Sequence, residues 1–87
     1  MSAPIPITLK LYASLAAYLP DGHQRNEAHV HVLDGTTVEQ LLDAHKMPRE
    51  ACHLVLVNGV YQSPKARTGL CLKTDDAVAV WPPVAGG

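Results

Sequence analysis

The stretch Ala77-Val78-Ala79-Val80-Trp81-Pro82-Pro83-Val84-Ala85-Gly86-Gly87 ends the chain and decides where its sheet stops. Its first five residues are all apolar, with the two valines pointing one way and the alanines and Trp81 the other, which predicts a strand. A residue before proline is driven toward extended geometry, and the two prolines fix φ and remove two backbone N–H donors. We therefore expect the last strand to end at Trp81.

Residues 82–87 are expected to form a flexible tail that leaves the body of the protein. A Pro-Pro unit is stiff and extended, at about 3.1 Å per residue. The six residues span on the order of 20 Å when extended, enough to enter another protein's active site. Gly86 and Gly87 lack a Cβ and can thread a narrow channel. The Gly87 carboxylate is ionised and a poor electrophile, so something else must activate it. A frayed terminus is the alternative.

The length and the charge of the chain argue against several classes of function. Eighty-seven residues are enough for one domain with a modest core, but too few for a core and a deep active site. Seven Lys and Arg balance eight Asp and Glu, so we predict no nucleic-acid binding. We expect no signal peptide at Met1 to Pro6, and no apolar run approaches the roughly 18 residues of a membrane span. The prediction is a soluble, cytoplasmic protein.

The two cysteines, Cys52 and Cys71, are predicted to be reduced and mostly buried. A domain of this size with a good apolar pattern needs no disulfide staple. A disulfide and a redox role are the alternatives.

The first third of the chain alternates between strand and helix patterns. Residues 5–12 place Ile or Leu at every second position and Tyr12 on the opposite, outer face, which predicts a half-buried strand. Residues 13–19 change to helical spacing and predict a short helix that ends at Pro20. Residues 28–32 alternate again and predict a second strand.

That second strand presents His29 and His31 together on its outer face. A His-x-His pair on one strand face can bind a metal ion, but no third ligand stands at a fixed spacing. We therefore predict no metal site and expect both imidazoles to face solvent.

The main helix is predicted after the turn signal Asp34-Gly35. Thr36 and Glu39 have the spacing of a capping box, in which each side chain bonds a backbone amide of the first turn. Apolar positions from Val38 to His45 form one stripe, and Met47-Pro48 is expected to end the helix. The histidine that ends the stripe is predicted to be partly buried rather than catalytic.

The last third of the chain predicts a hairpin and two turns. Residues 54–57 are continuously apolar and predict a strand covered on both faces, and Asn58-Gly59 is a strong hairpin signal before a return strand from residue 60. Residues 70–72 are expected to re-enter the core, and residues 74–76 to form a turn.

Between these elements, Ser63 to Gly69 is predicted to be an exposed loop. It carries Pro64, Lys65 and Arg67. The two cations are expected to be solvated, and binding of an acidic partner is the alternative.

Strands outnumber helices, and one amphipathic helix has one stripe to bury. This predicts an α+β domain over residues 1–81, with the main helix across a single face of one sheet.

The element order, together with Val57-Asn58-Gly59, Leu72 to Val78 and the ending Pro82 to Gly87, resembles the ThiS/MoaD sulfur-carrier proteins. The resemblance implies a ubiquitin-like β-grasp fold with a mixed sheet of about five strands, in which the first and last strands are parallel central neighbours. Where the family usually has Gly-Asp-Glu in the last turn, this chain has Asp75-Asp76-Ala77. Aspartate tolerates a left-handed turn position, so we expect the turn to survive.

The resemblance also implies the chemistry. An adenylating enzyme of the ubiquitin-activating type would use ATP to convert the Gly87 carboxylate to an acyl-adenylate, and a persulfide enzyme would supply sulfur for a thiocarboxylate. The ending looks most like the small subunit of molybdopterin synthase, whose thiocarboxylate enters the large subunit and gives sulfur to a pterin precursor. Trp81, Pro82, Pro83, Val84, Ala85 and Gly86 would then contact partners, and for Trp81 the alternative is packing at the edge of the sheet. The chain itself would bind no cofactor or metal.

Several functions remain open at this point. Sulfur delivery for thiamine or another pathway, and covalent modification of proteins, use the same kind of tail. An interaction module whose tail is never activated is a further alternative. The chain has no Ser/His/Asp, Cys/His or phosphate-loop arrangement, which favours a carrier over an enzyme.

Overall fold

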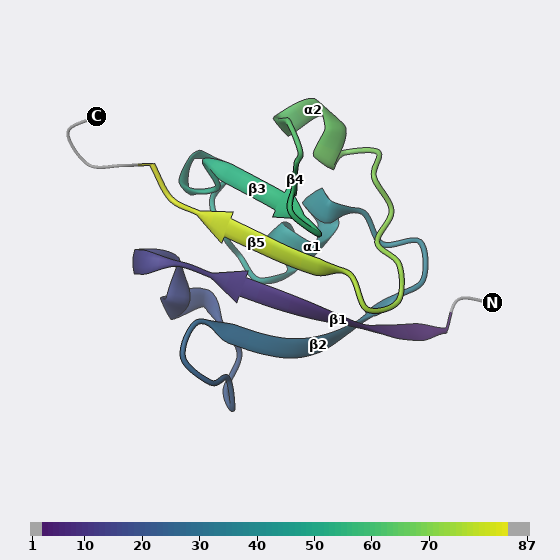
Figure 1. Ribbon diagram of the computed structural model, residues 1–87, viewed down its shortest axis with the longest axis horizontal. Coiled ribbons are helices and arrows are strands. Elements are labelled where there is room, and N and C mark those ends of the chain that lie inside the picture. The colour runs from purple at the N-terminus through teal and green to yellow at the C-terminus, as the bar shows by residue number, and fades with distance from the viewer. Residues whose placement is uncertain (1–2, 84–87) are drawn as a thin grey trace.

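A five-stranded mixed sheet in the order β2-β1-β5-β3-β4 forms the body of the structure (Figure 1). The computed structural model describes residues 3–83. β1 and β5 run parallel at the centre, and the other neighbouring pairs are antiparallel. This arrangement confirms the sheet and the parallel central pair implied by the resemblance. The strands are β1 (Pro4–Leu11), β2 (Glu27–Leu33), β3 (Leu54–Val57), β4 (Val60–Tyr61) and β5 (Ala77–Trp81).

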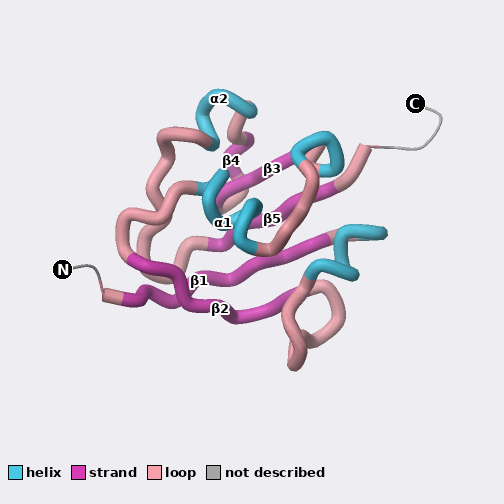
Figure 2. Tube along the Cα trace, turned by 180° about the vertical axis from the view of Figure 1, so that it is seen from behind, coloured by secondary structure: helices cyan, strands magenta, loops and turns pink. Residues whose placement is uncertain are grey.

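Helix α1 lies across one face of this sheet, behind it in Figure 1 and in front of it in Figure 2. The short helical segments flank the sheet, and η1 begins directly after β1. The opposite face carries no helix along its centre, as the two views show. The helices are α1 (Val38–Ala44), α2 (Pro64–Arg67) and the 3-10 helices η1 (Ala13–Tyr18) and η2 (Arg49–Ala51).

The core lies between α1 and the sheet. Every second residue of the central strands points into it, which confirms the alternation predicted for residues 5–12 and for the last strand. The two valines of β5 are fully buried, whereas its two alanines and Trp81 are only half-buried. Residues of α1, η1 and the 70–72 segment complete the core. The buried set includes Ile7, Leu9, Leu11, Leu15, Val38, Leu41, Leu42, Val55, Leu72, Val78 and Val80.

The capping box predicted at Thr36 and Glu39 is wrong by one residue. The cap is Thr37, whose hydroxyl accepts from the Gln40 N–H at 3.2 Å, while Gln40 Oε1 accepts from the Thr37 N–H at 2.9 Å. Thr36 is held in the preceding turn, because its hydroxyl donates to the Leu33 carbonyl at 2.6 Å and its own carbonyl accepts from the Leu72 N–H. Helical geometry can therefore begin only after that contact.

Helix α1 also ends earlier than Met47-Pro48. Its last residue is Ala44, and Lys46 adopts a left-handed φ of 61°. The Lys46 and Met47 N–H groups donate to the carbonyls of Asp43 and Leu42, which is the Schellman pattern of a helix end. Met47 is buried beside this end. The helix therefore ends where N–H groups of the following residues satisfy its last free carbonyls.

His45 caps the C-terminus of α1 and is half-buried, as predicted. Burial lowers the pKa of its imidazole from the ordinary value of 6.5. The unfolded chain therefore binds a proton at a higher pH than the folded protein does. Between the folded pKa and about 6.5, protonation favours unfolding, so this group's contribution to stability is lost as the pH falls.

This gives a pH prediction for His45→Gln. On acidification from about pH 8 to about pH 5, the unfolding free energy of the wild-type protein should fall more than that of the variant. Urea unfolding at several pH values measures the difference in unfolding free energy between the two proteins. Groups that titrate in both proteins contribute equally to each and cancel in this difference. A difference that is constant with pH would contradict the prediction.

The two predicted turns are confirmed with the expected backbone. Asn58 and Gly59 have φ values of 52° and 84°, the left-handed pair that a two-residue hairpin turn needs. Asp75 has a φ of 68°, so aspartate holds the left-handed position. The Asp76 carboxylate accepts from Asn58 Nδ2 and from the Lys73 N–H, each at 2.8 Å, and ties the turn to the hairpin.

The prediction of an exposed loop from Ser63 to Gly69 is wrong. Ser63 caps the short helix α2 by accepting from the Ala66 N–H at 3.1 Å, and Pro64 occupies its first turn. Lys65 is exposed, but Arg67 is only 6% exposed. The helix ends by turning Arg67 inward, so only one of the two cations is solvated.

Between residues 3 and 83, no helix has both the length and the apolar character needed to cross a membrane.

Candidate functional site

The central strand β5 brings the chain to the point where the predicted tail begins. Trp81 ends the strand, as predicted, and Pro82 and Pro83 continue from it. Pro82 is half-buried and Pro83 is exposed. Figure 1 shows this end of β5 on the side of the molecule opposite the start of β1. The other predicted site residues, Val84, Ala85, Gly86 and Gly87, lie outside the described residues.

Trp81 stacks on Tyr12, with ring centroids 4.3 Å apart and planes 3° from parallel. Tyr12 follows β1, the parallel neighbour of β5, so the two rings leave adjacent strands on the same face. Trp81 therefore packs against the centre of the sheet rather than its edge, which corrects the sheet-edge position considered from the sequence. The pattern of residues 5–12 placed Tyr12 on the outer face, but its partner was not predicted.

Backbone hydrogen bonds fix the end of β5 on both sides. The Tyr12 N–H donates to the Val80 carbonyl at 3.1 Å, and the His53 N–H donates to the Trp81 carbonyl at 3.0 Å. The prolines have no N–H to continue either ladder. The Trp81 carbonyl, which belongs to the peptide group that joins Trp81 to Pro82, is thus hydrogen-bonded to His53, the residue before β3.

An apolar patch extends from Trp81 across the face of the sheet opposite α1. Strand register places Leu54 opposite Trp81, and Leu56 between Ala79 and Tyr61. Directly opposed residues point to the same side of a sheet, so these side chains share one face. These side chains are half-buried or exposed, with Tyr61 52% exposed, so the prediction that residues 54–57 are covered on both faces is wrong. We call this set the open-face patch: Tyr12, Leu54, Leu56, Tyr61, Ala79 and Trp81.

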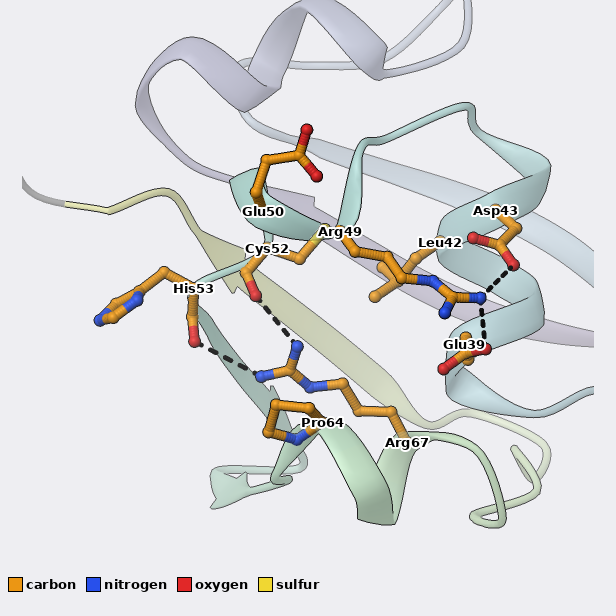
Figure 3. A pocket seen from close by; sticks show the side chains of 9 residues that line it. All are labelled: Glu39, Leu42, Asp43, Arg49, Glu50, Cys52, His53, Pro64 and Arg67. Atoms are coloured by element: carbon orange, nitrogen blue, oxygen red, sulfur yellow. Dashed lines mark hydrogen bonds and ion pairs between the residues drawn. The ribbon is translucent and has the colours of Figure 1, made fainter.

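A pocket of about 400 Å³ lies on the other side of β3, between α1, η2 and α2 (Figure 3). Arg49 crosses its rim, with Nη2 2.6 Å from Glu39 Oε1 and 3.6 Å from Asp43 Oδ2. Its wall contains Arg67, whose guanidinium points to the backbone carbonyls of Cys52 and His53. The pocket is lined by Glu39, Leu42, Asp43, Arg49, Glu50, Cys52, His53, Pro64 and Arg67.

The two thiols differ in their surroundings. Cys52 is buried, and its Sγ lies 3.6 Å from the Pro48 carbonyl. Burial raises the pKa of this thiol, which keeps it protonated and unreactive. Cys71 is exposed, so the prediction that it is buried is wrong. Its neighbours Leu70 and Leu72 do turn toward the core, and alternation along this extended segment turns Cys71 outward.

The two strand histidines lie on the exposed face of β2, as predicted. His29 contacts Thr8 through Nδ1 at 3.3 Å and Glu27 through Nε2 at 3.7 Å. Within the described part of the chain, no group of three or more His, Cys, Asp or Glu side chains could hold a metal ion.

Comparison with known proteins places these features in a family. The model of the ThiS family matches residues 10–87 of this chain. No curated protein matches the sequence.

Several solved structures share the fold, and three of them are the following. The Haloferax volcanii HVO 2177 protein has a TM-score of 0.75 at 24% identity, over 97% of this chain and 88% of that one. SAMP1 from the same organism has a TM-score of 0.66 at 25% identity, over 94% and 99%. A putative molybdopterin converting factor, subunit 1, from Pyrococcus furiosus has a TM-score of 0.64 at 22% identity, over 92% and 99%. These likenesses and the sheet order confirm the ubiquitin-like β-grasp fold.

Proposed function

This chain belongs to the ThiS family, and on that premise we propose that it is a sulfur carrier whose C-terminal Gly87 is converted to a thiocarboxylate. The match of the family model through Gly87 is the observation that carries the proposal. The route is adenylation of the Gly87 carboxylate by a partner enzyme that consumes ATP. A persulfide sulfur then displaces AMP and forms an acyl disulfide. A thiol attacks the donor sulfur of that disulfide, which releases the thiocarboxylate and leaves the thiol and the donor joined as a disulfide.

We further propose that the protein acts in molybdenum cofactor biosynthesis, as the small subunit of molybdopterin synthase in the cytoplasm. The ending Pro82 to Gly87 and the likeness to a molybdopterin converting factor subunit support this role. The chain is then a carrier rather than a catalyst. Acid, base and electrophilic groups for sulfur transfer belong to the large subunit, which receives the tail.

The geometry at the end of β5 supports a docking role for the sheet. The open-face patch is continuous with Trp81, the residue before the two prolines. A partner that covers this patch buries apolar surface, a favourable contribution to binding. The same contact places residues 82–87 beside that partner. Both the adenylating enzyme and the large synthase subunit are proposed to use it in turn.

Intact-mass spectrometry tests the carrier proposal. Protein co-expressed with its adenylating enzyme and a persulfide donor should gain the mass difference between sulfur and oxygen, located on Gly87 by fragmentation. The thiocarboxylate form, mixed with a large synthase subunit and the pterin precursor, should yield a dithiolene product. No mass gain while ATP is consumed would count heavily against a sulfur carrier. Sulfur delivery to a thiazole system, without dithiolene, would assign the thiamine pathway.

The likeness to SAMP1, a small archaeal modifier protein, favours protein modification as the second candidate. The two roles share the adenylate and differ in the acceptor. A modifier would join Gly87 to a lysine amine, and extracts would contain heavier adducts that carry a Gly-Gly remnant on lysine. If these adducts are absent and the thiocarboxylate is present, the result would favour the carrier role over the modifier role.

A further inference from the structure

Two hydrogen bonds in series connect the guanidinium of Arg67 to the end of β5. Arg67 Nη1 donates to the Cys52 carbonyl at 3.0 Å (Figure 3). The N–H of the same peptide group, that of His53, donates to the Trp81 carbonyl at 3.0 Å. That carbonyl belongs to the Trp81–Pro82 peptide bond. The Cys52–His53 peptide group is therefore the link between a buried cation and the first peptide group of the tail.

The guanidinium is held on more than one side. Nε donates to the Gln62 carbonyl at 2.9 Å, and Nη2 lies 3.4 Å from the His53 carbonyl. A guanidinium is planar and its N–H groups have fixed directions. Because it donates to carbonyls from two chain segments, the plane of the guanidinium is fixed. In turn, the guanidinium fixes the orientation of the peptide groups that carry those carbonyls.

The charge of Arg67 acts on the linking peptide. Among residues 3–83, it is the only charged side chain that is buried, and no described carboxylate pairs with it. A buried cation is costly unless hydrogen bonds compensate it, and here backbone carbonyls do so. Hydrogen bonds from a cation are stronger than neutral ones, and they polarise the peptide group that accepts them. This strengthens the His53 N–H as a donor to Trp81.

We propose that Arg67 is a positioning residue for the tail. It fixes the plane of the Cys52–His53 peptide, and through it the plane of the Trp81–Pro82 peptide, so that the chain leaves β5 in one direction. The consequence for activity rests on the proposed function, since the direction matters when a partner's active site receives residues 82–87. The hydrogen-bonded link itself can be measured without that function.

Arg67→Met tests the link, with Arg49→Met as the matched control. Arg49 lines the same pocket, but its side chain is 70% exposed, and among residues 3–83 its ion pairs are with the carboxylates of Glu39 and Asp43. The NMR scalar coupling across the hydrogen bond from the His53 nitrogen to the Trp81 carbonyl carbon reports the contact. Acrylamide quenching of Trp81, the single tryptophan, reports the exposure of its ring. We expect Arg67→Met to lose the coupling and to be quenched more readily, and Arg49→Met to match wild type.

The activity of the folded variants separates positioning from a structural role. With the carrier as the varied substrate of the adenylating enzyme, Arg67→Met should lower kcat for Gly87 activation by about tenfold, since misplaced reacting groups cost this much or more. KM should change less than kcat, because the residues of the open-face patch other than Trp81 keep their places. Arg67→Lys retains the charge without the planar fork and should have an intermediate kcat, and it carries the test if Arg67→Met does not fold.

An unchanged coupling and kcat in Arg67→Met would overturn the inference. If that variant does not fold, wild-type values in Arg67→Lys would overturn it instead. A wild-type protein that is never activated would contradict the proposed function alone, and the coupling and quenching measurements would then decide the role of Arg67.

Discussion

A variant with one alanine added after Gly87 is expected to fold like the parent protein and to form no thiocarboxylate. In the proposed mechanism, activation acts on the terminal carboxylate of Gly87, a residue without a side chain. The added residue moves the carboxylate one position further from Trp81 and puts a methyl group on the carbon next to the acyl carbon. Intact-mass spectrometry after incubation with the adenylating enzyme, ATP and a persulfide donor measures the loss.

The matched control carries the extra alanine at the other end of the chain. β1 starts at Pro4, on the opposite side of the molecule from the end of β5, so this variant should be converted at the wild-type rate (Figure 1). Circular dichroism and the urea midpoint should be the same for all three proteins. Full conversion of the Gly87-extended variant would contradict a mechanism that acts at the terminal carboxylate.

The strands were the predictable part of the fold, because their signal is local. In β5, alternate side chains face α1 and the open face, and the two valines that alternation assigns to the core are fully buried. The Asn58-Gly59 turn is equally local, since both residues tolerate the left-handed backbone that a tight hairpin needs. Such features depend on neighbours within a few residues, which the sequence contains.

The errors lie where a distant segment decides the outcome. The Thr36 spacing satisfies the capping-box pattern, but the contact of its carbonyl with Leu72 delays the helix by one residue. Arg67 is in a short polar stretch typical of a loop, yet carbonyls from Cys52 and His53 draw it inward. Its helix did have a local signal, Ser63-Pro64, in which serine caps and proline occupies the first turn.

The candidate site also contains residues that could be assigned from the sequence and residues that could not. Trp81, Pro82 and Pro83 could be assigned from the sequence because two consecutive prolines leave no N–H to continue the hydrogen-bond ladder. The groups that hold this strand end, Tyr12 and His53, belong to segments far away in the chain. They become its neighbours only through the strand order β1-β5-β3. Their identity therefore needs the three-dimensional structure.

Leu41→Ala is expected to cause the largest loss of stability among the changes considered. Leu41 lies in the middle of α1, is 2% exposed, and belongs to the apolar stripe that faces the sheet. Truncation of a buried leucine to alanine costs about 2–5 kcal/mol, through lost burial and the cavity left behind. A domain of this size has a total unfolding free energy of about 4–13 kcal/mol, so the loss is a large fraction of it.

Urea unfolding followed by circular dichroism measures this loss, and Asp43→Ala is the control on the same helix. Asp43 is exposed and contacts Arg49 at 3.6 Å, so its removal should change the unfolding free energy by less than about 1 kcal/mol. Equal stability of the two variants would contradict packing of α1 against the sheet as the main support of the domain. At a temperature where Leu41→Ala remains folded, its Gly87 should still be activated at the wild-type rate. This result would indicate that the core contributes to Gly87 activation only by keeping β5, and the prolines that follow it, in place.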